Sequence, residues 1–226
     1  MAKIIVAHRG GKEFFHENTL DAFKKAITIG APYFELDIRQ TKDKKVVCFH
    51  DPEIQNQKVE DLNFKELIDL SGIDVPLFED VLKLTKGKIK LLCEIKEENY
   101  EKETIKQIRA HYNIDDVIVV SFKEGILIKI HKQDPKIKTG LIIGKRNFDK
   151  IFKIKHCGAK YLMLSFIYIK LKIPFIAKLF GIKVFTWTVN DPELIVKYIK
   201  DKNIFGIITD EPQKALKLLA ASSNRK

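Results

Sequence analysis

Residues 4–11 read IIVAHRGG, a short apolar and β-branched run followed by a histidine, an arginine and two glycines. Such a run is typical of a buried parallel strand, which belongs either to an open, doubly wound sheet or to a closed barrel. An open sheet of the nucleotide-binding kind needs a glycine-rich phosphate turn after its first strand, and Gly10-Gly11 alone does not supply it. The first strand therefore favours the closed barrel and leaves the open sheet as the alternative.

The alternation of strand and helix continues along the whole chain. Seven more strand-like runs follow, at residues 33–38, 89–95, 117–122, 138–143, 161–165, 184–189 and 206–209. Segments of helical period lie between most of them, the clear ones at residues 19–29, 63–70, 100–112, 124–132, 148–156, 192–200 and 212–221. Asn18 or Thr19 is expected to cap the first of these helices, and Asp191-Pro192 to open the seventh barrel helix. Eight strand–helix units with short connections predict one (β/α)₈ TIM barrel over residues 1–226, with residues 221–226 as a flexible tail.

One additional strand-like run, at residues 46–49, follows the second strand too closely for a crossover helix. It should therefore fold back antiparallel, as a short hairpin after strand 2. With a two-residue turn at residues 43–44, Asp37 would pair with His50. The returning strand would then carry His50 to the mouth of the barrel, beside a carboxylate.

The composition restricts the class of protein. A chain of 226 residues with 45% hydrophobic and 31% charged residues can bury one sizeable core. Its three cysteines, Cys48, Cys93 and Cys157, show no paired spacing, which argues against a disulfide framework and against a zinc finger. The apolar stretch 161–185 is interrupted by four lysines and a proline, so we predict no transmembrane segment. A residue with a chemical role at position 8 leaves no room for a cleaved signal, and we expect a cytoplasmic protein.

The formal net charge of +11 has several possible meanings. A basic surface can bind nucleic acid, anionic lipid or a phosphorylated substrate. Most of the excess is lysine spread along the chain, and we interpret it as a solvated outer surface. The sequence has no basic helix and no alternation of basic and aromatic residues. A non-catalytic nucleic-acid-binding barrel is thus a remote alternative.

Acidic residues gather where predicted strands end, and in barrels the carboxyl ends of the strands form the active site. Because side chains alternate along a strand, Glu35 and Asp37 share one face of their strand, as do Glu94 and Lys96 of theirs. Three converging carboxylates need a positive partner. Oxygen ligands without cysteine select one hard divalent cation, Mg²⁺ or Ca²⁺. The alternative is a structural network in which basic side chains neutralise the acids: Arg9, Arg39 and Lys96.

A series of short motifs in this order resembles the glycerophosphodiester phosphodiesterase family. The motifs are His8-Arg9-Gly10, Glu17-Asn18-Thr19, Glu35-x-Asp37, Thr41-x-Asp43, His50-Asp51, Glu94-Ile95-Lys96, Trp187-Thr188-Val189-Asn190 and Ile207-Ile208-Thr209-Asp210. They extend across nearly the whole chain. The resemblance implies a TIM barrel of the phospholipase-C-like phosphodiesterase type. It also implies hydrolysis of small glycerophosphodiesters to glycerol 3-phosphate and an alcohol.

The resemblance also implies roles for single residues. His8 and His50 act as acid and base, and the metal ligands are Glu35, Asp37 and Glu94. Arg9 and Lys96 match positions that face the phosphate, where a guanidinium can bind two oxygens and an ammonium adds a point charge. Our first hypothesis takes His50 as the acid and His8 as the base. The sequence leaves open whether water or a substrate hydroxyl attacks first.

Other residues near the predicted mouth could shape specificity. Trp187 ends the seventh strand, where it either walls the substrate site or belongs to the core. His16 follows the first strand, and we expect it at the surface. Only residues 52–61 separate His50-Asp51 from the next helix, so little covers the site, and a lysophospholipase D or a cyclising phospholipase is the alternative function. The apolar, lysine-rich segment 168–181 either contacts a membrane or packs as the sixth helix.

Overall fold

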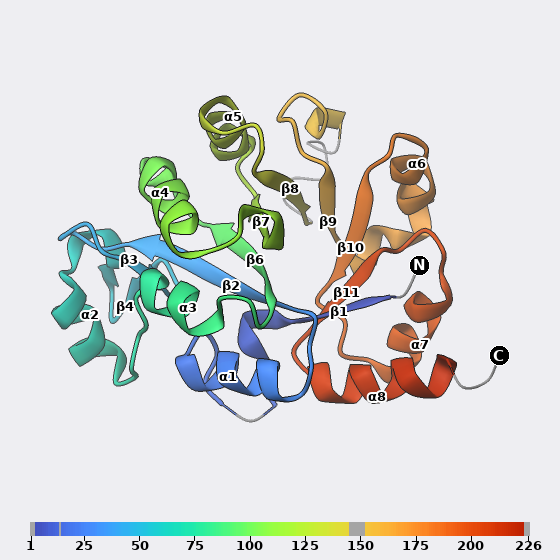
Figure 1. Ribbon diagram of the computed structural model, residues 1–226, viewed down its shortest axis with the longest axis horizontal. Helices are drawn as coiled ribbons and strands as arrows, with labels where there is room; N and C mark the ends of the chain where they lie inside the picture. Colours follow the sequence, from blue (N-terminus) through green and yellow to red (C-terminus); the bar gives the residue numbers. More distant parts are fainter. Residues whose placement is uncertain (1–2, 14, 145–151, 224–226) are drawn as a thin grey trace.

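The computed structural model describes residues 3–13, 15–144 and 152–223. Eight parallel strands form its barrel: β1 (Ile4–Ala7), β2 (Tyr33–Gln40), β6 (Lys90–Ile95), β7 (Val117–Ser121), β8 (Lys138–Ile143), β9 (Tyr161–Ser165), β10 (Lys183–Trp187) and β11 (Gly206–Thr209). Each strand pairs with the next, and β1 pairs with both β11 and β2, so the sheet closes on itself (Figure 1). The closed barrel is confirmed, and the open sheet is wrong.

The described chain has eight α-helices: α1 (Leu20–Thr28), α2 (Phe64–Ser71), α3 (Phe78–Thr85), α4 (Glu101–His111), α5 (Glu124–Gln133), α6 (Ile173–Leu179), α7 (Pro192–Lys200) and α8 (Pro212–Ser223). Seven of them cover the barrel, and α2 packs to one side on the segment that follows β2. Thr19 caps α1 by accepting a hydrogen bond from the backbone N–H of Ala22. Asp191 caps α7 by accepting one from the N–H of Leu194, with Pro192 in the first turn. Both helices thus begin at the capping residues predicted from the sequence.

Three expectations about helices need correction. Helix α3 is absent from the predicted set because it has only eight residues and no side-chain cap to mark its start. Helix α8 continues to Ser223, past the tail predicted from residue 221, and the hydroxyls of Ser222 and Ser223 donate to carbonyls one turn back. Of the predicted helix 148–156, residues 148–151 lie outside the described residues, and residues 152–156 form a short 3₁₀ and turn segment rather than an α-helix.

The hairpin after β2 is confirmed, with β3 (Val46–Cys48) antiparallel to β2, but its predicted register is wrong by one residue. Cys48 pairs with Ile38, which places His50 one position away from the expected partner Asp37. The reason is the turn, which has three residues instead of two and holds Lys44 at a left-handed φ of 63°. Beyond β3, a small hairpin of β4 (Glu53–Ile54) and β5 (Gln57–Lys58) leads to α2.

The interior of the barrel is apolar at its centre and charged at one end. Its core includes Val6, Leu92, Ile118, Val120, Ile142, Met163, Phe185 and Ile208. Phe185 packs so closely on β11 that a Cβ at position 206 would lie 2.5 Å from its ring, which is why Gly206 is needed there. Asp37 and Glu94 lie in the second halves of β2 and β6, and Glu35 lies on β2 just past the level at which β1 ends, so all three lie above the apolar layers. Among the described helices, none is long and apolar enough to cross a bilayer.

Candidate active site

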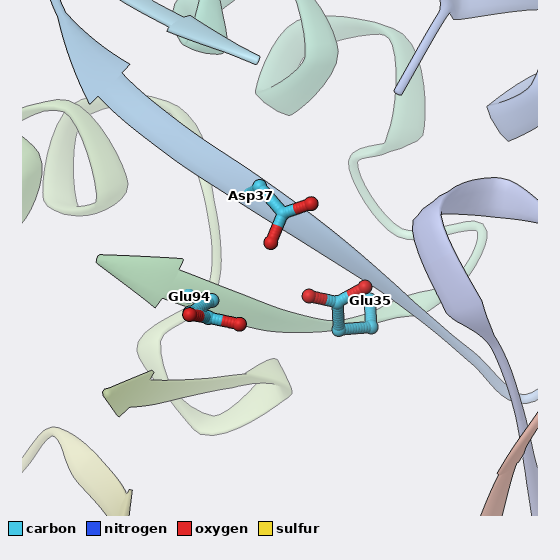
Figure 2. A group of neighbouring side chains, drawn as sticks. All are labelled: Glu35, Asp37 and Glu94. Carbon is cyan, nitrogen blue, oxygen red and sulfur yellow. The ribbon is translucent and has the colours of Figure 1, made fainter. Parts of the chain in front are cut away.

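Three buried carboxylates form the centre of the site. Glu35 and Asp37 lie on β2, Glu94 lies on β6, and the strand register places Asp37 opposite Glu94. One oxygen from each residue lies within 4.8 Å of the others (Figure 2). The alternation of side chains along the two strands thus brings together the three acids that the sequence singled out. They offer oxygen ligands alone, which suits a hard divalent cation.

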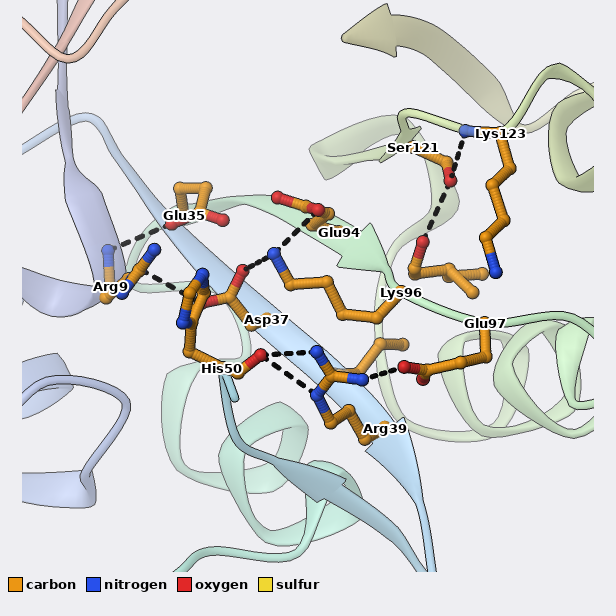
Figure 3. A network of polar contacts seen from close by, with 12 residues as sticks. Arg9, Glu35, Asp37, Arg39, His50, Glu94, Lys96, Glu97, Ser121 and Lys123 are labelled. Carbon is orange, nitrogen blue, oxygen red and sulfur yellow. Dashed lines mark hydrogen bonds and ion pairs between the residues drawn. The ribbon is translucent and has the colours of Figure 1, made fainter. Parts of the chain in front are cut away.

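Two basic side chains reach into this cluster. The ammonium of Lys96 lies 2.7 Å from Asp37 and 2.6 Å from Glu94 (Figure 3). The guanidinium of Arg9 lies 3.0 Å from Asp37, and its backbone N–H donates to Glu35 at 3.0 Å. Part of the structural network considered from the sequence is therefore present. Arg39 is not part of it, because its guanidinium contacts Glu97 and the carbonyl of His50 instead.

The positive charge does not balance the negative charge. Arg9 is shared, since it also contacts Glu17 at 2.7 Å. Among the described residues, Glu35 contacts the backbone N–H of Arg9 and, less closely, the ring of His8, whose Nε2 is 3.9 Å away. A buried carboxylate with so little compensation is costly, and a divalent cation bound among the three acids would remove that cost.

The pKa values show the same imbalance. Burial raises the pKa of Glu35 well above its ordinary value, and the charges of Asp37 and Glu94 raise it further. Burial also raises the pKa of Glu94 to about 7, although Lys96 opposes the shift. Burial acts in the same direction on Asp37, but Lys96 and Arg9 outweigh it and hold the pKa of Asp37 well below its usual range. Glu35 and Glu94 therefore lack positive charge nearby, whereas Asp37 has enough of it.

His8 is held rigidly at the end of β1. Its Nδ1 lies 2.7 Å from Asp210, which follows β11, and Asp210 in turn accepts a hydrogen bond from the side chain of Asn190. Burial raises the pKa of Asp210, but the hydrogen bond from His8 and other contacts outweigh it, so the net shift is downward. Because an ionised carboxylate only accepts, Nδ1 of His8 carries a proton and Nε2 faces the cluster.

His50 is held more loosely, two residues after β3. Its Nδ1 lies 2.7 Å from Asp51, whose side chain is 66% exposed. The backbone carbonyl of His50 accepts a hydrogen bond from Arg39, which fixes the main chain rather than the ring. Burial lowers the pKa of His50, and the nearby charge of Lys96 lowers it further. The ring is thus neutral near pH 7.

Sequence reasoning missed three residues that support this site. Asp210 and Asn190 orient His8, and Asn18 orients Asp37 by donating to its carboxylate at 2.9 Å and accepting from its backbone N–H at 3.1 Å. Asn18 has a φ of 57°, so it is bent inward rather than capping α1. All three lie inside the quoted motifs, but only the fold shows which side chains they contact.

Trp187 lies at the rim of the mouth, away from the carboxylates. Its indole N–H donates to the carbonyl of Met163 at 2.9 Å, and its ring meets the edge of Phe122 at 5.7 Å between centroids. It is partly exposed and packs against the apolar interior. Its packing agrees with the core interpretation, and a role as a wall of the substrate site stays a prediction.

A small pocket of about 150 Å³ opens beside His50. It is lined by His16, Glu17, Asn18, Phe49, His50, Asp51, Ile54, Ser71 and Ile73. His16 is exposed, as expected, yet it also borders this pocket. The pocket combines charged and apolar walls next to a residue of the site, which suits one end of a small polar ligand.

Comparison with known proteins points to one family. The sequence matches the model of the Glycerophosphoryl diester phosphodiesterase family over residues 8–214. It is 30% identical to the glycerophosphodiester phosphodiesterase of Caldanaerobacter subterraneus subsp. tengcongensis, across 97% of this chain and 98% of the relative. The crystal structure of a glycerophosphodiester phosphodiesterase from Thermotoga maritima superposes with a TM-score of 0.84 at 28% identity, covering 96% of this chain and 99% of that one. A segment covering 57% of this chain is 38% identical to a lysophospholipase D of Rattus norvegicus, of which it covers 42%.

Proposed function

The chain belongs to the glycerophosphoryl diester phosphodiesterase family and hydrolyses glycerophosphodiesters to glycerol 3-phosphate and an alcohol, and we propose that it does so with the cluster at the ends of β1, β2 and β6. One observation carries this proposal: three buried carboxylates converge within 4.8 Å of one another at the open end of the barrel.

In this proposal Glu35, Asp37 and Glu94 hold one divalent cation, Mg²⁺ or Ca²⁺. The support is the donor set, which is all oxygen, buried and short of positive charge. When bound, the cation neutralises phosphate oxygens and lowers the pKa of a coordinated hydroxyl. Lys96 now contacts two of the three ligands, so the lysine and the cation compete for the same oxygens.

Arg9 and Lys96 bind the phosphate in this scheme. Both side chains are largely buried at the mouth and lie against the carboxylates. With the three carboxylates holding a cation, Arg9 and Lys96 would be available to an anionic ligand. The guanidinium of Arg9 can then bind two phosphoryl oxygens, while Lys96 adds a single charge. Glu17 keeps Arg9 in position through its own ion pair.

His8 and His50 supply the acid and the base. Asp210 holds Nδ1 of His8 at 2.7 Å, which fixes the ring and directs its Nε2 toward Glu35, 3.9 Å away. The pKa of His50 is lowered by burial, so its neutral ring can accept a proton. These surroundings favour His8 as the acid that protonates the leaving alcohol and His50 as the base, the reverse of our first hypothesis.

The two histidines can be told apart with a leaving group that needs no proton, such as nitrophenolate. We expect His8→Ala and His50→Ala each to lose about 10²- to 10⁴-fold in rate on an alkyl phosphodiester. The nitrophenyl substrate should restore part of the rate to His8→Ala and none to His50→Ala. His111→Ala, far from the site on α4, is the control and should keep full activity. Rescue of His50→Ala alone would reverse the roles, and full activity of both folded variants would refute the pair.

A lysophospholipid is the second candidate substrate. The partial match to a lysophospholipase D favours it, as does the short β4–β5 connection after His50, which leaves the mouth open. Rates on glycerophosphocholine and on a lysophospholipid should be compared under one assay. Phosphorus NMR of the products would show a cyclic phosphate if the neighbouring glycerol hydroxyl, rather than water, attacks first.

We also propose a cytoplasmic location and no nucleic-acid partner. All three cysteines are buried free thiols, which is typical of proteins in a reducing compartment. The open end of the barrel presents carboxylates where a nucleic acid would require positive charge. Size-exclusion chromatography in salt with added RNA should show no complex.

A further inference from the structure

The excess positive charge of this protein is concentrated in one part of the chain. Residues 150–190 contain eight lysines and no aspartate or glutamate, so they carry eight of the eleven net positive charges. The remainder of the chain is nearly balanced. The lysines are therefore not evenly spread along the chain, as we first took them to be, but gather in this segment.

The same segment exposes apolar side chains. It includes the 3₁₀ segment η5 (Phe166–Leu171) and α6. Among the described residues, seven large hydrophobic side chains are exposed, and six lie within residues 150–190. One of the six is Phe152, and the other five lie on or next to η5 and α6: Ile167, Phe175, Ile176, Leu179 and Phe180. We call these five side chains the η5–α6 surface.

The geometry of α6 gathers them on one side. Phe175, Ile176 and Leu179 follow helical spacing on the outside, while Pro174 and Ala177 are buried against the barrel. Figure 1 places α6 at the periphery, next to β10. Since η5 leaves the barrel at the carboxyl end of β9, the η5–α6 surface begins at the rim of the active-site mouth.

Lysines border this apolar surface. The ammonium of Lys155 lies over the ring of Phe180, 4.1 Å from its centroid. Lys172 and Lys178 are exposed at the start and near the end of α6. Exposed apolar side chains with a lysine border are the combination that lets a helix lie in the interface of an anionic membrane.

We propose that the η5–α6 surface docks the enzyme on an anionic lipid bilayer. The apolar side chains enter the boundary between headgroups and acyl chains, and Lys155 and Lys178 contact lipid phosphates. The charge of the segment favours an anionic bilayer over a second copy of the chain as the partner of this surface. Two copies joined through this surface would bring two strongly basic segments together, which is repulsive, whereas an anionic bilayer is attracted. Docking there would hold the mouth close to lipid-derived phosphodiesters.

Vesicle sedimentation without substrate tests the proposal. We expect the protein to bind vesicles that contain phosphatidylglycerol, to bind phosphatidylcholine vesicles weakly, and to dissociate as salt rises. Leu179→Ser with Phe180→Ser should weaken binding by about tenfold or more, because both side chains are exposed and apolar. Lys155→Glu with Lys178→Glu should weaken it at least as much.

A matched control reverses two exposed lysines on other helices, Lys65→Glu on α2 and Lys102→Glu on α4, and should bind as the unchanged protein does. All variants should keep full activity on soluble glycerophosphocholine, which shows that they are folded. A His8→Ala protein should still bind vesicles, so failure of docking and failure of the catalytic scheme are separate results.

Two outcomes would overturn the proposal. The first is equal binding of the charge-reversed and control variants, which would make the attraction a matter of net charge alone. The second is a protein that forms a dimer without lipid and becomes a monomer when Leu179 and Phe180 are replaced, because then a second copy covers the surface.

Discussion

The two halves of the barrel differ in what their strands present at the mouth. The ends of β1, β2 and β6 carry charged groups that contact one another: His8, Arg9, Glu35, Asp37, Glu94 and Lys96. The ends of β7 to β10 carry neutral ones: Ser121, Gly144, Ser165 and Trp187. The proposed site therefore lies on neighbouring strands, in what we call the charged half, and the other, neutral half carries an apolar rim and the basic η5–α6 surface.

Closure of the barrel is what completes the charged half. Asp210 follows the last strand and orients His8 at the end of the first, a contact between residues 202 positions apart. An open sheet would place these two strands at opposite edges. The first and last segments of the chain are therefore both required for one histidine to point its Nε2 at the carboxylates.

The largest expected effect comes from the carboxylates. Glu35→Gln, Asp37→Asn and Glu94→Gln should each lower kcat by about 10³-fold or more, and excess chelator should do the same to the unchanged protein. Glu60→Gln, an exposed isosteric change near β5, is the control. In calorimetry, the three variants should lose heat of Mg²⁺ or Ca²⁺ binding while the control retains it. Full activity in chelator would disprove the metal assignment.

The raised pKa of Glu94 makes a related prediction about stability. Because burial raises its folded-state pKa to about 7, the folded protein without metal binds a proton that the unfolded chain has released. The metal-free protein should therefore lose stability as pH rises from about 4 to 7. Glu94→Gln should lose less over the same range. Tm measured against pH in chelator checks the sign, and identical curves for the two proteins would contradict it.

The sequence was sufficient for the charged half because its signals are local. Apolar β-branched runs marked the strands, and alternation alone placed Glu35 and Asp37 on one face. The partners of these residues were not predictable in the same way. Asp210 and Asn190 contact the site only because the barrel closes. Arg39 contacts Glu97 and the carbonyl of His50, which follows β3, rather than the acids.

Other features of the fold were not predicted for local reasons that the sequence pattern does not reveal. Lys44 adopts a left-handed conformation that usually selects glycine or asparagine, so the three-residue turn and its register were not anticipated. Helix α3 begins after Leu77 without a capping side chain. The concentration of lysine in residues 150–190 was visible in the sequence, but it became meaningful only when the fold exposed apolar side chains beside it.

A smaller effect is expected from the residues that orient the two histidines. Asp210→Asn should lower kcat by about 10- to 100-fold with little change in KM, because the amide no longer fixes the tautomer and the orientation of the His8 ring. Asp51→Asn should cost less, since Asp51 is 66% exposed and water can replace it beside His50. Comparison of kcat for the two variants tests whether His8 depends more on its partner. Equal losses would show that rigidity at His8 does not matter.

The neutral half should affect binding more than turnover. Trp187→Ala removes a partly exposed wall and the hydrogen bond to Met163, so we expect KM to rise by several-fold and kcat to change little. Trp187→Phe keeps the contact with Phe122 and should recover most of the loss. Steady-state kinetics on glycerophosphocholine separate the two constants. A fall in kcat as large as that of Asp210→Asn would show that Trp187 acts in the chemical step and not only in substrate binding.

The smallest effect on activity is expected inside the charged half itself, at Cys48. The residue lies on β3 only two positions before His50, yet its side chain is 1% exposed and points into the apolar core. Burial raises the pKa of its thiol well above the ordinary value, so almost no thiolate forms near neutral pH. Cys48→Ala should therefore keep kcat and KM within about twofold and lower the free energy of unfolding by about 1 kcal/mol through a small cavity. Cys157→Ala, buried in the neutral half, is the matched control, and the two variants should behave alike. Loss of activity confined to folded Cys48→Ala would mean that the charged half includes a thiol, and that nearness to the site, rather than orientation toward it, decides which residues take part.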